Sequence, residues 1–115
     1  MRRSNRIAHL IQKVVGEHLI SSEVDERIYG ASITEVKMSS DLKTATLYNQ
    51  IPSTWKGDKA EFMRIFSRSA KPMRQHLARM AELKRVPALR FVYDETLDNA
   101  ERIYSIMTEH KDNEN

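Results

Sequence analysis

The clearest pattern in the chain is an apolar stripe between residues 59 and 80, with a basic stripe opposite it. Apolar residues recur there at the spacing of one face of an α-helix. They are Phe62, Phe66, Ala70, Met73, Leu77 and Met80. Polar and basic residues on the other side keep the same spacing, namely Arg64, Arg68, Lys71, Gln75 and Arg79. The pattern predicts helical structure with one side in a core and the other available to a negatively charged partner.

Pro72 interrupts this helical segment. A proline inside a helix lacks a backbone donor, clashes with the carbonyl four residues earlier, and disfavours helical angles at the residue before it. Because proline is well tolerated in the first turn of a helix, the sequence predicts two helices with residues 69–71 outside helical geometry. Ser69 is a candidate cap of the second helix. Free amides at that helix start would favour a phosphate, and the basic residues around them are Arg68, Lys71 and Arg74.

The segment before this pair predicts a helix and a β-hairpin. Helical spacing of apolar residues indicates a helix at residues 5–20, with Ser4 as its N-cap. Apolar residues then alternate from 31 to 38, but their phase slips near Thr34–Glu35, which a β-bulge would explain. After a polar turn, residues 44–51 alternate as the partner strand.

The segment after the pair predicts a third strand and a last helix. Residues 88–93 alternate as a strand directly after Pro87, residues 97–107 show helical spacing, and residues 108–115 are expected to be a disordered tail. The implied order is α-β-β-α-kink-α-β with a short C-terminal helix. We therefore expect one α+β domain over residues 1–115, with a core at about 4–107 and helices covering one face of a three-stranded sheet.

Charge changes this picture because it is segregated along the chain. The net charge of the 115 residues is only +3, yet residues 59–87 hold eight basic and two acidic residues, and residues 1–20 hold four and one. Such segregation is typical of proteins that bind polyanions, although a solvated basic face is the alternative. The candidate RNA-binding residues are Arg2, Arg3, Arg6, Arg64, Arg68, Ser69, Ala70, Lys71, Arg74, Gln75, Arg79, Lys84 and Arg85.

Other residue types exclude several functions. The absence of cysteine excludes disulfides, thiolate catalysis and cysteine-bound zinc. No apolar run reaches the roughly 20 residues of a membrane helix, and the N-terminus lacks an apolar signal core, so a cytoplasmic protein is expected. The four histidines do not pair at metal-binding spacing, and His18 is interpreted as a packed side chain. No cofactor or metal is therefore expected.

A binding protein is favoured over an enzyme, since no phosphate-binding loop or nucleophile motif occurs among the three glycines. Two kinds of partner stay open: RNA, or an acidic protein that docks on the basic face. Trp55, in the loop before residue 59, is interpreted as covering the core edge, with stacking on a base as the alternative.

Three segments resemble the ribosome-binding factor A family of bacteria. They read VPALRFVYDETL at 86–97, ITEVKMSSDLKTATLY at 33–48 and DERI at 25–28, and the resemblance covers roughly residues 4–107. It implies a type II KH-like domain that binds the immature 30S ribosomal subunit, near the 5′ end of 16S rRNA and its first helix. It further implies promotion of late 30S maturation and 16S rRNA processing without catalysis, as a monomer, and suggests release by a GTPase.

The chain departs from that family where function is expected. The family carries an Ala-x-Gly kink between its central helices, whereas the matching positions here are Ser69-Ala70-Lys71, followed by Pro72. Glycine would allow the backbone to approach RNA closely. The sequence alone leaves the effect of this replacement open.

Overall fold

The computed structural model describes residues 3–80 and 83–96, and within them the chain has an α+β fold. Its elements are α1 (Arg3–Leu19), the 3₁₀ helix η1 (Glu26–Ile28), β1 (Ser32–Met38), β2 (Thr44–Gln50), α2 (Lys59–Arg68), α3 (Ala70–Met80) and β3 (Ala88–Tyr93). This order confirms the predicted fold class. The helix expected at 97–107 and the tail expected at 108–115 lie outside the described residues.

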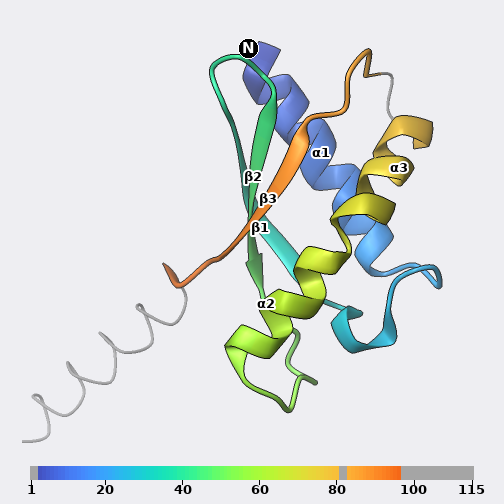
Figure 1. Ribbon diagram of the computed structural model, residues 1–115, viewed down its shortest axis with the longest axis vertical. Coiled ribbons are helices and arrows are strands. Elements are labelled where there is room, and N and C mark those ends of the chain that lie inside the picture. The colour runs from blue at the N-terminus through green and yellow to red at the C-terminus, as the bar shows by residue number, and fades with distance from the viewer. Residues whose placement is uncertain (1–2, 81–82, 97–115) are drawn as a thin grey trace, which may run out of the picture.

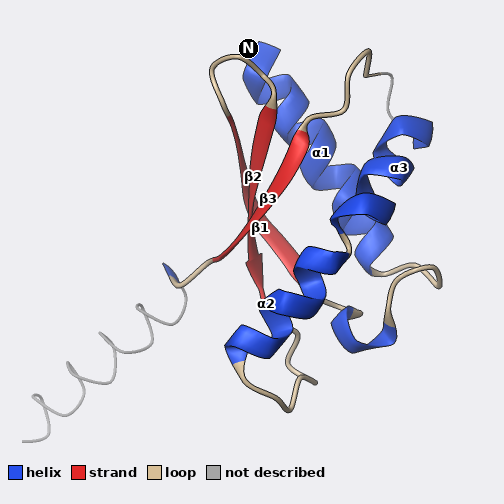
Figure 2. Ribbon diagram, in the orientation of Figure 1, coloured by secondary structure: helices blue, strands red, loops and turns tan. Residues whose placement is uncertain are grey.

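The sheet has the strand order β1-β2-β3. β1 and β2 pair antiparallel as a hairpin, whereas β2 and β3 pair parallel. Parallel neighbours need a long crossover, which α2 and α3 supply. α1, α2 and α3 lie on the same side of the strands, which gives a two-layer arrangement (Figures 1 and 2).

The β-bulge predicted in β1 is confirmed. Pairing with β2 shifts register between Ile33 and Glu35, so Thr34 is the extra residue. Ile33 and Val36 are both buried as a result, although they are three positions apart in a strand. One inserted residue reverses which face the following side chains occupy, and this explains the slip in phase along the sequence.

One cluster of buried apolar side chains joins the helices to the sheet. Phe66, Met73, Leu77, Val36 and Leu47 are at most 7 % exposed, as the sequence predicted. Leu89 and Phe91 are only half-buried, so the prediction that they would be mostly buried is wrong. They lie on β3, which stands at one end of the strand order and is covered less completely than central β2.

Two local predictions had different outcomes. α1 already includes Arg3, so Ser4 lies inside the helix and is not its N-cap. Serine fits there because the first-turn amides have no helical acceptor in any case. Trp55 does cover the core edge: its ring meets Phe62 edge-on at 5.5 Å, and its Nε1 donates to the Asp58 carbonyl at 3.1 Å.

No helix of the described residues is long and apolar enough to cross a membrane.

Candidate nucleic-acid interface

α2 presents its basic residues because its other side is fixed in the core. The Asp58 carboxylate accepts the Glu61 amide at 2.7 Å and so caps the helix start. Phe62, Ile65 and Phe66 are buried against the rest of the fold. Helical geometry then directs Arg64 and Arg68 outward, and both are exposed.

The predicted break between the two helices is confirmed, but it is shorter than expected. Only Ser69 separates α2 from α3, and its φ of −81° and ψ of −4° stay close to helical values. Its amide donates to the Phe66 carbonyl, three residues back, which tightens the last turn of α2. The prediction that all of residues 69–71 leave helical geometry is therefore wrong, because Ala70 and Lys71 belong to α3.

Pro72 is tolerated because it is the third residue of α3. The first amides of a helix have no intrahelical acceptor, so the missing N–H costs nothing there. The first i to i−4 bond of α3 follows directly, since the Met73 amide donates to the Ser69 carbonyl at 3.0 Å. The proline thus ends α2 and leaves the hydrogen bonds of α3 intact.

α3 continues the basic face, and one of its residues also has a structural role. Met73 and Leu77 are buried, whereas Lys71, Gln75 and Arg79 are exposed on the outer side. Arg74 is exposed as well, but its guanidinium donates to the carbonyls of Pro87 (3.2 Å) and Val86 (3.3 Å). Arg74 therefore attaches α3 to the segment that enters β3, while part of its five-donor group stays available.

A second basic group lies where three distant segments meet. A hollow of about 130 Å³ is lined by residues from the start of α1, the β1–β2 turn and the segment before β3. Its basic residues are Arg3, Lys43, Lys84 and Arg85. Three of these four were predicted as RNA-binding residues. Lys43 was missed, because in the sequence it is one isolated lysine in a hairpin turn.

The turn that carries Lys43 is held by local hydrogen bonds. The Asp41 carboxylate accepts from the Ser39 hydroxyl at 2.7 Å and from the Lys43 amide at 3.0 Å. These two bonds, with the first as the larger cause, hold the pKa of the Asp41 carboxyl below its usual value. The acidic residue of the hollow is therefore already engaged, and the lysine beside it is exposed.

A larger hollow of about 390 Å³ lies beside the junction of α2 and α3. Arg68, Ser69 and Pro72 line one side, and residues that follow α1, among them Glu23, Asp25 and Arg27, line the other. Arg27 and Asp25 form an ion pair at 2.7 Å, and hydrogen bonds from Arg27 lower the pKa of Asp25 to about 2. This hollow has acidic and basic side chains in equal number, whereas basic side chains predominate in the smaller hollow.

The prediction that no two histidines pair is wrong for His18 and His76. His18 lines the larger hollow, and its ring lies 4.9 Å from the ring of His76, measured between centroids. The spacing along the sequence could not show this pairing, because α1 and α3 meet only in the folded chain. His18 is packed as expected, with 5 % of its surface exposed.

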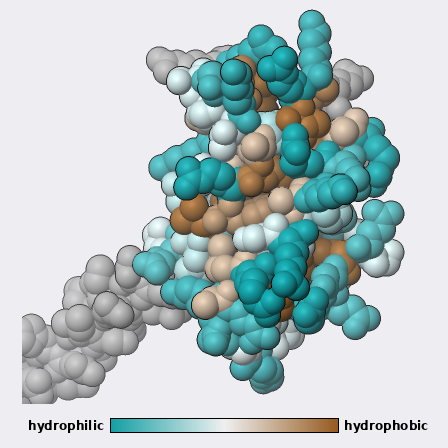
Figure 3. Space-filling view, viewed as in Figure 1, coloured by the Kyte–Doolittle hydropathy of each residue, from teal (hydrophilic) through white to brown (hydrophobic). Residues whose placement is uncertain are grey.

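Most of the predicted RNA-binding residues are exposed, but not all. Ser69 is buried and Ala70 is half-buried, so the junction itself offers little side-chain surface. Arg2 lies outside the described residues. Exposed are Arg3, Arg6, Arg64, Arg68, Lys71, Arg74, Gln75, Arg79, Lys84 and Arg85. Figure 3 shows hydrophilic side chains over much of this face, with apolar residues exposed across its middle.

Comparison with known proteins decides the family. A sequence model described as Ribosome-binding factor A matches residues 3–107. The chain belongs to this family. A ribosome-binding factor A of Methylorubrum extorquens strain PA1 is 35 % identical over 113 residues, covering 96 % of this chain and 77 % of the relative. That of Legionella pneumophila strain Lens is 31 % identical over 109 residues, with coverage of 94 % and 86 %.

Solved structures agree with the fold. The crystal structure of ribosome-binding factor A from Thermus thermophilus superposes with a TM-score of 0.67 at 20 % identity, covering 80 % of this chain and 97 % of that one. A homology model of Thermus thermophilus ribosome-binding factor A, fitted into the cryo-EM map of a 30S complex, gives a TM-score of 0.59 at 23 % identity, with coverage of 76 % and 94 %.

The missing kink glycine is explained by the local backbone. Among the described residues, only Leu42 and Gly30 have positive φ angles, and Lys71 lies in α3. The position that matches the family's glycine therefore requires no special backbone conformation in this chain. Ser69 and Pro72 make the break instead.

Proposed function

We propose that this protein binds the immature 30S ribosomal subunit through 16S rRNA, near its 5′ end and first helix, and promotes late maturation and processing without catalysis. The carrying observation is family membership together with an exposed basic face on α2 and α3. A relative with the same fold has been placed in a 30S complex. We further propose that the protein acts as a single-domain cytoplasmic monomer that leaves with the help of a GTPase.

The first contact surface in this proposal is the outer side of α2 and α3. Arg64, Arg68 and Lys71 are exposed there at helical spacing, close to the start of α3. Arginine suits phosphate contacts because its planar group presents paired donors. Such contacts fix register on RNA and carry little sequence information, so recognition would depend on the shape of the RNA.

The second contact surface is the basic hollow that contains Arg3, Lys43, Lys84 and Arg85. Arg74 connects the two surfaces, because it lies on α3 and bonds to Val86 and Pro87, just after Lys84 and Arg85 in the chain. An RNA backbone could therefore contact both groups. A protein that prefers one RNA conformation shifts the population toward it, and no covalent step is needed.

The test compares two charge-reversed proteins with equal net charge. One carries Arg64→Glu, Arg68→Glu and Lys71→Glu, which leaves Arg74 and its bonds to the β3 segment intact. The control carries Lys13→Glu, Lys37→Glu and Lys56→Glu, three exposed lysines outside the two basic surfaces. Both are first checked for an unchanged circular dichroism spectrum and melting temperature.

Sedimentation with immature 30S subunits is the measurement. We expect the affinity of the first variant for 30S subunits to fall by at least tenfold, because about three phosphate contacts are lost. The affinity of the control should stay near that of the unmodified protein. Equal loss in both, or none in the first, would place the binding surface elsewhere. Direct binding to an isolated 16S rRNA 5′ fragment separates RNA binding from docking on an acidic ribosomal protein, since only RNA binding needs no ribosomal protein.

A further inference from the structure

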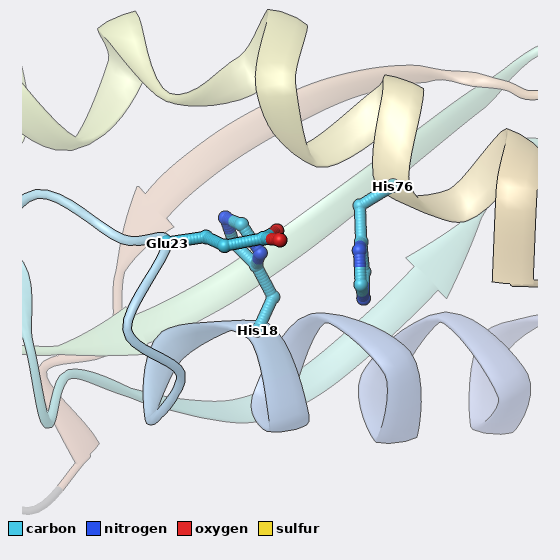
Figure 4. Close-up of side chains that lie close together, drawn as sticks. All are labelled: His18, Glu23 and His76. Carbon is cyan, nitrogen blue, oxygen red and sulfur yellow. The ribbon is translucent and has the colours of Figure 1, made fainter.

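Three potential metal ligands meet where the end of α1, the loop after it and the middle of α3 come together. They are His18, Glu23 and His76, and one ligand atom from each lies within 4.8 Å of the others. The Glu23 carboxylate lies beside the His18 ring, and the His76 ring extends from α3 toward α1 (Figure 4). Two of the three side chains come from well-formed helices, which fixes their backbone positions.

His18 has an unused polar group in this cluster. The side chain is 5 % exposed, and its Nδ1 is buried without a hydrogen-bond partner among the described residues. A buried polar atom without a partner is destabilising, so such atoms often indicate a functional contact. His76 is half-buried and Glu23 is exposed, which leaves a path from solvent to the cluster.

The buried position of His18 favours its neutral form. Burial lowers the pKa of His18, and the nearby His76 lowers it further. Glu23 acts in the opposite direction, and Arg79 again lowers the pKa. A neutral imidazole is the form that binds a metal ion, because its nitrogen lone pair must be free.

We infer that His18, Glu23 and His76 form a binding site for a divalent transition-metal ion, with Zn²⁺ as the best match. Two imidazoles and one carboxylate are a ligand set that Zn²⁺ accepts, leaving a fourth position for water. In a tetrahedral site with Zn²⁺ bonds of about 2.0–2.1 Å, ligand atoms are about 3.3 Å apart. The spread of up to 4.8 Å closes by small side-chain rotations, because Glu23 lies on a loop.

A bound ion would join three segments at one point. α1 and α3 pack on the same side of the sheet, and Glu23 belongs to the segment that lines the hollow at the α2–α3 junction. Binding to the folded state alone raises stability with ligand concentration. The ion would thus fix the end of α1 to α3, behind the exposed basic residues.

The test titrates the full chain, without any affinity tag, with Zn²⁺ at neutral pH in calorimetry. Three variants are compared: His76→Gln and Glu23→Gln remove partly or fully exposed ligands, and His9→Gln is the control. His9 is an exposed histidine on α1, outside the cluster. His18 is left intact because a substitution at a buried position could unfold the protein.

We expect the unmodified protein and His9→Gln to bind about one Zn²⁺ with equal affinity, and to melt at higher temperature as Zn²⁺ increases. His76→Gln should weaken affinity by at least tenfold, since even the loss of groups that only orient metal ligands typically costs 10–100-fold. Glu23→Gln should have an effect of similar direction. Binding should also weaken as pH falls, because protons compete for the imidazoles.

Two results would overturn the inference. One is that the unmodified protein does not bind Zn²⁺ beyond the weak binding of isolated surface histidines. The other is that His76→Gln and His9→Gln bind Zn²⁺ with equal affinity, so that the histidine in the cluster has no special effect. A visible spectrum of the Co²⁺-substituted protein adds an independent readout, since tetrahedral coordination gives absorption that His76→Gln should remove.

Discussion

Phe66 makes two ring contacts, one within α2 and one that joins α2 to β3 of the sheet. The side chain is fully buried, and its ring lies 5.4 Å from that of Phe62 and 4.8 Å from that of Phe91, the latter edge-on. Edge-on aromatic pairs are favourable beyond the area that they bury. Truncation of Phe66 should therefore remove core contacts both within α2 and between α2 and β3.

Phe66→Ala should lower the free energy of unfolding by about 3–5 kcal/mol, the usual cost of a large cavity. Urea denaturation measures this change. Ser67→Ala, at the neighbouring exposed position, should change stability by no more than about 0.5 kcal/mol. A loss below about 1 kcal/mol in Phe66→Ala would contradict the burial of this ring.

Asp25 gives a prediction about pH. Hydrogen bonds from Arg27 lower the pKa of its carboxyl from 3.8 to about 2 in the folded state. The folded state therefore favours the carboxylate, and this contribution to stability is present above about pH 4 and is lost as the pH falls toward 2. Because the pair is solvent-exposed, water screens it, and its contribution to the free energy of unfolding at neutral pH is small.

Asp25→Asn removes the charge but keeps an oxygen that can accept the Arg27 amide. Stability measured by denaturation should be lower in this variant at neutral pH, and the two proteins should converge in the acidic range. High salt should also reduce the difference, since it screens exposed pairs. A difference that persists unchanged at acidic pH would show that Asp25 acts through something other than its charge.

At this scale, the sequence predicted apolar residues better than polar ones. Helical spacing placed Phe66 and Leu77 in the core, because burial follows directly from which side of a helix a residue occupies. The meeting of His18 and His76 could not be predicted, since it depends on how α1 packs against α3. Arg74 was predicted as a binding residue. Its bonds to backbone carbonyls could not be predicted either, because they depend on how α3 packs against the segment before β3.

The junction of α2 and α3 shows the same division at the scale of elements. Proline chemistry predicted the break, and the hairpin and its bulge followed from the alternation of apolar residues. The extent of the break could not be predicted, because one residue is enough when its neighbours on both sides are held in the core. Phe66 and Met73 are buried on either side of Ser69.

Pro72→Ala should keep the fold while changing the junction. Alanine supplies the amide that Pro72 lacks, so a bond to the Arg68 carbonyl becomes possible and α2 could continue into α3. Stability should change by no more than about 1 kcal/mol, because Pro72 is exposed and already fits a first turn. The affinity for 30S subunits should fall by more than the small change in stability explains, since the basic residues on the two helices would be realigned.

Amide hydrogen exchange at Ser69 to Met73 measures this change directly. The expected result is that the new alanine amide is protected, exchanging more slowly than in an unstructured peptide, because it donates to the Arg68 carbonyl. An unchanged exchange pattern together with unchanged 30S association would show that the proline does not shape the interface.

The whole molecule combines basic residues from segments that are far apart in sequence. The +6 charge of residues 59–87 was visible in the sequence, but the gathering of Arg3, Lys43 and Lys84 around one hollow was not. That arrangement depends on the topology, which brings the start of α1, the hairpin turn and the entrance to β3 to the same end. The sequence thus predicted the sign of the surface and only part of its extent.

Binding to a 16S rRNA 5′ fragment should depend strongly on salt. If four to six basic groups meet phosphates, log K should fall with log salt at a slope of roughly −3 to −5. Lys43→Ala and Lys71→Ala should each flatten that slope by somewhat under one, whereas Lys56→Ala should leave it unchanged. Fluorescence anisotropy at several salt concentrations measures the slope, and an effect of Lys56 equal to that of Lys71 would indicate unspecific attraction.

The parallel pairing of β2 with β3 also has a consequence for how the chain folds during synthesis. Thr44 pairs with Ala88, so the third strand can join only after both crossover helices have left the ribosomal exit tunnel. Local contacts in the hairpin form early, whereas such distant pairing is slow because a long loop must close first. Until then Phe66 lacks its partner Phe91 and the open edge of β2 has no neighbour on that side. A nascent chain halted before residue 88 therefore exposes an incomplete sheet, the state most prone to aggregation.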